Sequence, residues 1–349
     1  MEPLDDAKFS GTKEVAEHLT IEVSNLQPWI DEFVPGAGKI KSVEQFKGGQ
    51  SNPTYKIVTE SKNLVLRRKP PGKLLPSAHA VDREYKVITA LYETDVPVPK
   101  TYGLCEDDEV AGTAFFVMDF LDGDLFWNPM IPSLSNKDRT EIYRNKNKTL
   151  ALLHGVDYKK IGLEDYGKPG NYVARQVARW SKQYRASETD DIEAMNNLID
   201  WLPKNIPDDD ETSIVHGDYR LDNMILKNNQ VMGILDWELS TLGHPIADFS
   251  YHCLSWRTQE AFWDQAKLKE LGVPSEKEYM DMYCENTGKD LSKNWEFYMA
   301  FNMFKIAGIL QGILGRVRDG TASSKHAEDR GMMVYPLSEA AWNTIKENF

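Results

Sequence analysis

The sequence predicts an α+β protein of two lobes, with an antiparallel sheet in the first lobe and mainly helices in the second. Three observations lead to this fold class. Short alternating segments between residues 42 and 120 are separated by glycine-rich or proline-rich turns, which is typical of antiparallel strands. Apolar residues at helical spacing occupy most of residues 135–347. A single strand–turn–strand segment, Met224–Leu235, interrupts those helices.

Length and composition restrict the possible partners. A chain of 349 residues is long enough for two hydrophobic cores, and its net charge of −13 argues against nucleic acid or an anionic membrane. Cys105, Cys253 and Cys284 are odd in number and far apart, which favours a reducing compartment. The acidic start is unlike a secretory signal, and polar residues interrupt the most apolar segment, Trp295–Leu314. We therefore expect a cytoplasmic protein without a membrane partner, and the sequence leaves the oligomeric state open.

The first lobe is predicted to begin irregularly over residues 1–20 and then to form a helix over residues 23–33. Residues 42–58 predict a hairpin whose turn contains Gly48, Gly49 and Ser51. A glycine-rich tip can lay backbone N–H groups over phosphate oxygens, because glycine allows the backbone to approach closely. An ordinary hairpin turn explains the same residues equally well.

A third strand, Leu64–Arg67, and the helix Val81–Tyr92 follow. Period-two alternation places Val65 and Arg67 on one face of the strand. Arg67 can hold phosphate through bidentate contacts, and Glu84 on the helix is its natural partner. Two plainer interpretations stay open: Arg67 could protect a solvated edge strand, and Glu84 could be an ordinary surface carboxylate.

Residues 114–120 read as a buried strand that ends the first lobe. The next tripeptide, Leu121-Asp122-Gly123, resembles a hinge whose backbone could meet an adenine ring. Met118 and Phe120 are therefore candidate nucleotide contacts.

The second lobe is predicted to be mostly helical. Ser135 is a plausible N-cap for a helix that reaches His154. A second helix carries a basic face that could receive an anionic acceptor or could simply be solvated. That face consists of Arg175, Arg179, Lys182 and Arg185. Further helices are expected over residues 192–202, 260–285, 295–317 and 328–347.

The candidate catalytic and metal-binding residues lie in the segment between these predicted helices. Asn223 follows Asp218 by five residues, and a hairpin then leads to Asp236. Phosphoryl transfer needs a group that orients the attacking hydroxyl and hard oxygen ligands for Mg²⁺. The spacing is that of the protein-kinase catalytic loop, so Asp218 is the candidate base and Asn223 and Asp236 are the candidate metal ligands. Asp248 is expected to brace the loop by hydrogen bonds. The plain alternative is a turn rich in Asp and Asn that caps a helix.

Residues 214–248, which read IVHGDYRLDNMILKNNQVMGILDWELSTLGHPIAD, resemble the aminoglycoside phosphotransferase and choline kinase superfamily. The segments FKGGQSNPTY and LVLRRKPPGKLLPSAHAVDREYKV also resemble the kinase-like amino-terminal domain of certain acyl-CoA dehydrogenase family members and their stand-alone bacterial relatives. The resemblance implies a protein-kinase-like fold. Residues 1–121 would form the nucleotide-covering lobe, and residues 122–349 the helical lobe with its catalytic loop at 214–248.

The resemblance also implies a function. It would make the protein a kinase that uses ATP and Mg²⁺ to phosphorylate a hydroxyl of a small molecule, with Arg67 and Glu84 as the phosphate-side pair. The closer relatives imply a hydroxy fatty acid carried as its coenzyme A ester. An aminoglycoside or choline-like acceptor, and a catalytically silent nucleotide-binding module, stay open as alternatives. The sequence departs from the kinase pattern in two places: Arg67 replaces the usual lysine, and the glycine turn has no GxGxxG.

Overall fold

The structure is a computed structural model, and it describes residues 10–48, 52–72, 79–258, 265–322 and 326–349. The chain divides into two compact units. Unit 1 comprises Met1–Tyr166, Asp218–Ser240 and Leu271–Val273, and unit 2 comprises Gly167–Gly217, Thr241–Glu270 and Pro274–Phe349. All of the predicted site residues belong to unit 1. The division into lobes at residues 121 and 122 stays a prediction.

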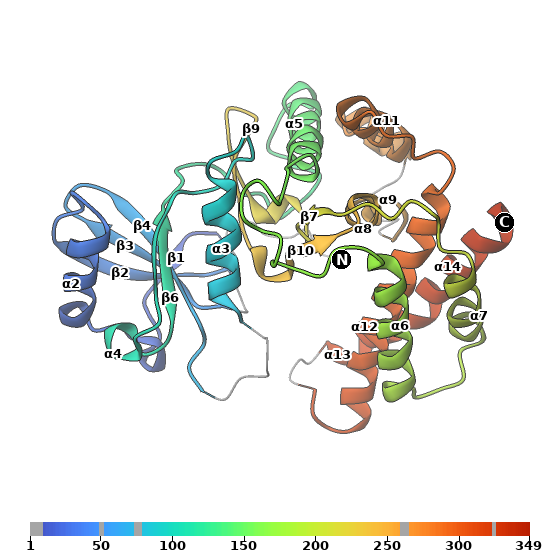
Figure 1. Cartoon of the computed structure of the whole chain (residues 1–349), viewed down its shortest axis with the longest axis horizontal. Coiled ribbons are helices and arrows are strands. Elements are labelled where there is room, and N and C mark those ends of the chain that lie inside the picture. The colour runs from blue at the N-terminus through green and yellow to red at the C-terminus, as the bar shows by residue number, and fades with distance from the viewer. Residues whose placement is uncertain (1–9, 49–51, 73–78, 259–264, 323–325) are drawn as a thin grey trace. The chain divides into compact units, whose positions relative to one another are not determined.

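Unit 1 is built on an antiparallel sheet with the strand order β1-β2-β3-β4-β6-β5, drawn in blue to green in Figure 1. Its strands are β1 (Thr12–Lys13), β2 (Ile40–Phe46), β3 (Thr54–Thr59), β4 (Asn63–Arg68), β5 (Thr101–Cys105) and β6 (Phe115–Asp119). β4 pairs with β3 on one side and with β6 on the other. The edge-strand interpretation of Arg67 is therefore wrong, because β4 is an interior strand.

The two faces of this sheet differ in what they carry. Alternation along β4 sends Leu64 and Leu66 into an apolar core, which also contains Leu26 and Ile30 of α2 (Val23–Phe33). α3 (Val81–Leu91) lies on the opposite side of the sheet from α2 (Figure 1). Phe116, the cross-strand neighbour of Arg67, is fully buried and its ring lies 6.1 Å from that of Tyr85 of α3. Both faces of the sheet are therefore packed, and Arg67 is placed on the face that α3 covers.

The rest of unit 1 holds a helix and a hairpin. Ser135 caps α5 (Asn136–His154) by accepting a hydrogen bond from the backbone N–H of Asp138, as its position predicts. β8 (Met224–Lys227) and β9 (Gln230–Ile234) form the predicted hairpin. Both turn residues, Asn228 and Asn229, have positive φ, which asparagine tolerates and two-residue hairpins require. The shorter elements are η1 (Glu17–Leu19), α4 (Asp108–Ala111), η3 (Leu221–Asn223) and η4 (Trp237–Leu239).

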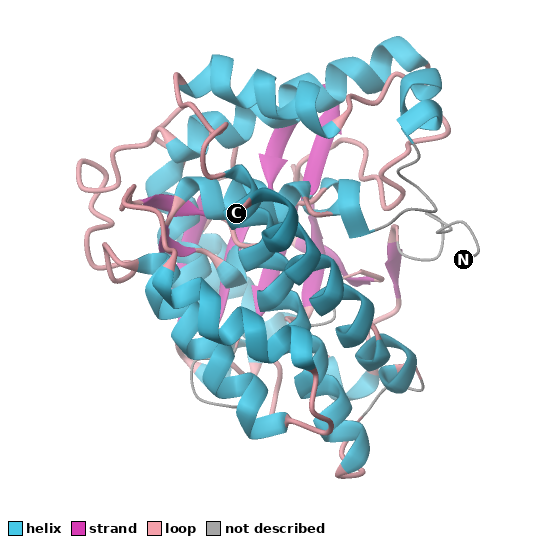
Figure 2. Cartoon of the chain, turned by 90° about the vertical axis from the view of Figure 1, so that its right-hand side faces the viewer, coloured by secondary structure: helices cyan, strands magenta, loops and turns pink. Residues whose placement is uncertain are grey.

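Unit 2 is mainly helical, as the cyan ribbons in the foreground of Figure 2 show. Its helices are α6 (Tyr172–Ser187), α7 (Glu193–Trp201), η2 (Leu202–Lys204), α8 (Pro245–Cys253), α9 (Ser255–Thr258), α10 (Gln265–Leu271, whose last residue belongs to unit 1), α11 (Glu276–Thr287), α12 (Trp295–Arg318), α13 (Ala327–Met332) and α14 (Val334–Asn348). β7 (Ser213–Val215) and β10 (Thr241–Gly243) pair in antiparallel fashion. α6 and α14 pack against α12.

The apolar helix α12 is the core helix of unit 2. Within the described part of the chain, it alone has the length and hydropathy that a membrane span requires, with a mean hydropathy of 1.3 over its most apolar window. Of that window, 72% is buried inside the protein. Gly308 lies against Trp180 of α6, so the two helices approach closely at that point. This burial is what the core helix of a globular unit shows.

Several predicted boundaries were wrong. Residues 260–264 lie outside the described residues, and the rest of the helix predicted over 260–285 is two helices, because Gly272 has a φ of 72° and Pro274 follows it. Helix 328–347 is divided near Met333 into α13 and α14. β5 and α4 were not predicted at all. The described part of residues 1–20 contains β1 and η1, so it is more regular than expected.

Candidate functional site

Arg67 and Glu84 form a buried ion pair between β4 and α3. The Arg67 Nε atom lies 2.8 Å from one Glu84 carboxylate oxygen and donates to the other at 3.0 Å. The Arg67 side chain is 10% exposed and that of Glu84 is 1% exposed, so the surface-carboxylate interpretation of Glu84 is wrong. Burial raises the pKa of the Glu84 carboxyl, and the charge of Arg67 opposes that rise.

Arg67 also reaches a carboxylate that lies 169 residues away in the sequence. Its Nη2 atom donates to Asp236 Oδ1 at 2.5 Å. Burial alone would lower the pKa of the Arg67 guanidinium, but the charges of Glu84 and Asp236 outweigh it and raise that pKa. Among the residues that the structure describes, the remaining terminal nitrogen, Nη1, has a single long contact, of 3.5 Å, with Thr54 Oγ1. One arginine therefore joins β4, α3 and the end of β9, and it keeps donor capacity for a further ligand.

The backbone presents Asp236 in an unusual conformation. Asp236 has a φ of 62° and a ψ of 65°, which is a left-handed conformation that few side chains other than Asp and Asn adopt. The next residue, Trp237, is fully buried, and its indole N–H donates to Ile234 O at 3.0 Å. This anchor fixes the turn, so the Asp236 side chain, 33% exposed, is aimed by the fold.

Asp218 and Asn223 are also in contact. The Asn223 Nδ2 atom donates to the Asp218 backbone oxygen at 3.0 Å and to Asp218 Oδ2 at 3.2 Å. Arg220 Nε lies 3.3 Å from Asp218 Oδ1. The Asn223 backbone oxygen accepts from the N–H of Leu235 at 2.8 Å, which places the loop beside the residue that precedes Asp236.

Asp248 braces the residues just before Asp218. Its two carboxylate oxygens each accept a 2.9 Å hydrogen bond, one from the backbone N–H of His216 and one from that of Gly217. These three residues belong to unit 2, and Asp248 is 5% exposed. The predicted bracing contact is confirmed.

The other predicted nucleotide contacts are placed unevenly. Gly49 and Ser51 lie outside the described residues, and Gly48 is half-buried at the end of β2. Met118 pairs with Val65 across β4 and β6, so it shares the sheet face of Arg67. Phe120 stacks on Phe46, with ring centroids 6.4 Å apart. Their contact with a nucleobase stays a prediction.

The hinge segment is held tightly by the hairpin. Asp124 and Leu226 exchange two backbone hydrogen bonds, of 2.7 and 2.8 Å. Gly123 has to be glycine here, because a Cβ atom would collide with the backbone oxygen of Leu226. The strand that carries Met118 is therefore linked directly to the hairpin that carries Asp236.

The donor set fits Mg²⁺ and a nucleotide phosphate. With its Nδ2 turned toward Asp218, Asn223 has its amide oxygen left for a cation, and Asp236 adds a partly exposed carboxylate. Arg67 supplies a positive charge whose fork suits phosphate oxygens. No cluster of three or more His, Cys, Asp or Glu side chains suited to a metal occurs in the described ranges. The fit therefore rests on a mixed amide and carboxylate pair.

Two nearby polar residues were missed by sequence reasoning. Asn52 donates its amide to Glu84 Oε1 at 2.8 Å, and Glu238 Oε2 lies 4.0 Å from Arg67 Nη2. The available signals were the position of Asn52 close to the two glycines and the position of Glu238 two residues after Asp236. Neither signal specifies a contact without the fold.

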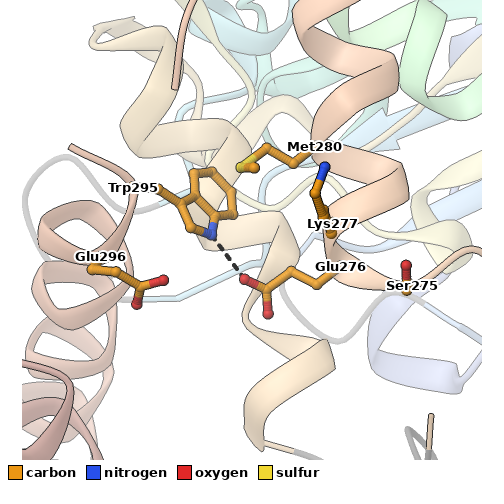
Figure 3. A pocket seen from close by; sticks show the side chains of 6 residues that line it. All are labelled: Ser275, Glu276, Lys277, Met280, Trp295 and Glu296. Atoms are coloured by element: carbon orange, nitrogen blue, oxygen red, sulfur yellow. Dashed lines mark hydrogen bonds between the residues drawn. The ribbon is translucent and has the colours of Figure 1, made fainter. Parts of the chain in front are cut away.

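A separate hollow of about 390 Å³ lies in unit 2 between α11 and α12 (Figure 3). Its lining residues are Ser275, Glu276, Lys277, Met280, Trp295 and Glu296. The Trp295 indole N–H donates to Glu276 at 2.8 Å, and Arg257 pairs with both Glu276 and Glu296 at 2.5 Å. Both of its carboxylates are hydrogen-bonded to Arg257, and none of the predicted phosphoryl-transfer residues lines this hollow.

The relatives with similar sequences are longer proteins, and this chain matches one part of each. The chain is 45% identical to acyl-CoA dehydrogenase family member 10 of Mus musculus over 87% of its own length and 29% of that protein. It is 38% identical to acyl-CoA dehydrogenase family member 11 of Homo sapiens, over 97% of this chain and 45% of the relative. The chain thus spans less than half of each of these two relatives.

Solved structures share the fold over nearly the whole chain. A candidate aminoglycoside phosphotransferase from Ralstonia eutropha JMP134 is 49% identical, with a TM-score of 0.86 over 95% of this chain and 100% of that one. Choline kinase from Cryptosporidium parvum is 12% identical, with a TM-score of 0.62 over 92% of this chain and 97% of its own. The predicted kinase-like α+β fold is confirmed.

A family model identifies the chain more directly. The model described as the phosphotransferase enzyme family matches residues 42–283, a range that contains every predicted site residue from Gly48 to Asp236. The match covers well over half of the chain, and it includes both the sheet of unit 1 and the loop that carries Asp218. The chain therefore belongs to the phosphotransferase enzyme family.

Proposed function

We propose that this protein transfers the γ-phosphoryl group of Mg²⁺-bound ATP to a hydroxyl of a small molecule. One observation carries the proposal: Arg67 bonds both Glu84 and Asp236, which joins three distant segments within unit 1. The same unit contains the hydrogen-bonded pair Asp218 and Asn223. These residue types are the ones that phosphoryl transfer needs.

Each residue has a distinct part in the reaction. The oxygen of the acceptor hydroxyl attacks the γ-phosphorus and ADP leaves, while Asp218 accepts the proton of that hydroxyl. Asn223 and Asp236 hold the metal, and Arg67 binds phosphate oxygens while Glu84 fixes its orientation. When bound, Mg²⁺-ATP supplies the phosphoryl group and a cation that stabilises developing charge.

For the acceptor we propose a hydroxyacyl coenzyme A. Two relatives at 38% and 45% identity are named as acyl-CoA dehydrogenase family members, and the chain corresponds to one portion of each. Exposed Arg179 and Lys182 on α6 suit an anionic acceptor. The second candidate is an aminoglycoside or choline-like cation, which the net charge of −13 favours.

ADP release measured against three acceptor panels tests the substrate class. Hydroxyacyl-CoAs with the hydroxyl at different carbons form the first panel, aminoglycosides the second, and choline with other amino alcohols the third. We expect turnover in the first panel. Turnover confined to the second or third panel would reject the acyl-CoA acceptor, and ATP binding without turnover in any panel would favour the silent module.

Asp218→Asn tests the catalytic assignment. Loss of the base should lower phosphotransfer by at least about a thousandfold while Mg²⁺-ATP binding survives, because this side chain acts on the acceptor. The matched control is Asp165→Asn, since Asp165 is 72% exposed and pairs with Lys86. If Asp218→Asn turns over as fast as that control, Asp218 is not the base.

A further inference from the structure

Asn52 is a buried polar residue whose side chain serves the Arg67–Glu84 pair. It lies between the glycine turn and β3, and its residue is 0% exposed. The Asn52 Nδ2 atom donates to Glu84 Oε1 at 2.8 Å, and the same oxygen accepts from Arg67 Nε at 3.0 Å. A buried amide that donates to a buried carboxylate fixes the position of that carboxylate.

The other end of the Asn52 amide is also bonded. Its Oδ1 atom lies 3.0 Å from Nδ1 of His79, a half-buried residue with a φ of 59° that precedes α3. Because an amide oxygen can only accept, His79 Nδ1 carries the proton of this bond. The hydrogen bonds thus run from His79 through Asn52 to Glu84, and both Arg67 and Asn52 donate to that carboxylate.

Arg67 needs this support more than a lysine would. A guanidinium is planar and presents its donors in fixed directions, so its use depends on the orientation of the whole group. Glu84 holds only the Nε edge, and Asp236 holds Nη2. If Glu84 turned about its side-chain bonds, the Nη1 donor would turn with Arg67 away from its present direction.

We propose that Asn52 is a positioning residue for nucleotide binding, which fixes Glu84 and through it the phosphate-binding direction of Arg67. The inference rests on the proposed function, because it assigns ATP phosphates to Arg67. If Asn52 had only a structural role, its substitution would lower stability and would not weaken the binding of ATP more than that of adenosine.

The experiment measures Mg²⁺-ATP affinity by calorimetry and adenosine affinity by ligand-observed NMR. The variant is Asn52→Ala, and the control is Thr59→Val at the far end of β3, since buried Thr59 donates to Lys62 O at 2.8 Å. Loss of one charge-assisted hydrogen bond predicts about tenfold weaker ATP binding for Asn52→Ala. Adenosine binding should be unchanged in Asn52→Ala, and Thr59→Val should bind ATP as the wild type does.

Two outcomes overturn the inference: ATP affinity retained in Asn52→Ala, or adenosine affinity that falls in parallel with it. Asn52→Leu keeps a similar side-chain volume and has neither a donor nor a charge, so it replaces the alanine variant if that variant does not fold, with the same expected loss. A wild type that binds no Mg²⁺-ATP would instead reject the proposed function itself. Wild-type binding with an unaffected Asn52→Ala rejects the positioning role alone.

Discussion

Each unit contains an arginine that bridges two carboxylates, and the two arrangements differ in how completely the arginine's donors are used. In unit 2, every nitrogen of the Arg257 guanidinium bonds a carboxylate oxygen of Glu276 or Glu296, at 2.5 to 3.1 Å. In unit 1, Arg67 bonds Glu84 and Asp236 through two nitrogens, and its third reaches Thr54 only at 3.5 Å.

This difference is the one expected between a structural ion pair and the proposed phosphate-binding site. Glu276 accepts from both Arg257 and Trp295, so its lone pairs are used within the protein. Asp236 has one short contact to arginine and keeps a third of its side chain exposed. Both arginines bridge two carboxylates, and the Arg257 side chain is the more exposed, at 25% against 10% for Arg67. Spare donor and acceptor capacity, and not exposure of the arginine, is therefore what a ligand could use.

The largest expected effect is on catalysis at Asp236. Asp236→Asn keeps the shape and the left-handed backbone but removes the charge, so phosphotransfer should fall by roughly a thousandfold as metal stabilisation of the transition state is lost. The measurement is ADP release at saturating Mg²⁺. Glu296→Gln, the corresponding change beside Arg257, should keep wild-type turnover per folded molecule, and equal losses in both variants would remove the distinction.

The next effect is on stability at Arg257. Arg257→Ala removes the shared partner of Glu276 and Glu296, whose side chains are 17% and 29% exposed, so the free energy of unfolding should fall by about 1–2 kcal/mol. Urea denaturation followed by tryptophan fluorescence measures it. Mg²⁺-ATP affinity of the folded variant should equal that of the wild type. Weaker ATP binding with unchanged stability would show that Arg257 has the role assigned to Arg67.

Arg67→Lys should have a smaller effect. A single ammonium cannot bond Glu84 and Asp236 while also directing a fork at phosphate, so Mg²⁺-ATP affinity should fall about tenfold or less. Calorimetric titration measures the change, and Arg257→Lys is the control that should leave affinity unaltered. Tighter ATP binding in Arg67→Lys would mean that the usual lysine fits this site better than the arginine.

The smallest expected effect concerns pH and a second polar cluster of unit 2. Burial lowers the pKa of His244 from its ordinary value of 6.5, although the Asp209 contacts oppose the shift. The His244 imidazole therefore binds a proton more readily in the unfolded chain than in the folded one. The stability of the folded state is unaffected by this histidine above pH 6.5, and it falls as pH drops below 6.5 and the unfolded chain takes up the proton. His244→Gln should therefore flatten the fall in Tm between pH 7 and 5.5. An unchanged pH profile would exclude His244 as its source.

Short-range sequence patterns predicted most elements of the fold and most of the candidate site residues. The spacing from Asp218 to Asn223, the Asn228–Asn229 turn and the Ser135 cap are all short-range signals, and the structure contains each of them. Alternation along β4 placed Arg67 on the α3 side. The signals that were present but misjudged are also local: Gly272 and Pro274 divide the predicted helix 260–285.

Contacts between distant segments could not be predicted in the same way. Arg67 was expected to meet Glu84, 17 residues away, because a strand and the next helix often pack together. Its bond to Asp236 depends on how the hairpin packs against the hinge, which no spacing in the sequence encodes. The contacts of Asn52 could not be predicted for the same reason. Its partners Glu84 and His79 belong to α3 and to the segment before α3, which are distant from Asn52 in the sequence.

The left-handed backbone at Asp236 limits which amino acids this position can accept, whatever the reaction. Branched side chains such as Val and Ile would add steric strain to the lost carboxylate, whereas Gly would relieve the strain and lose only the ligand. A saturation library at this codon, sorted for folded protein instead of turnover, should therefore enrich Asp, Asn and Gly. The shape of the main chain would then be visible as a preference that persists in the absence of any substrate.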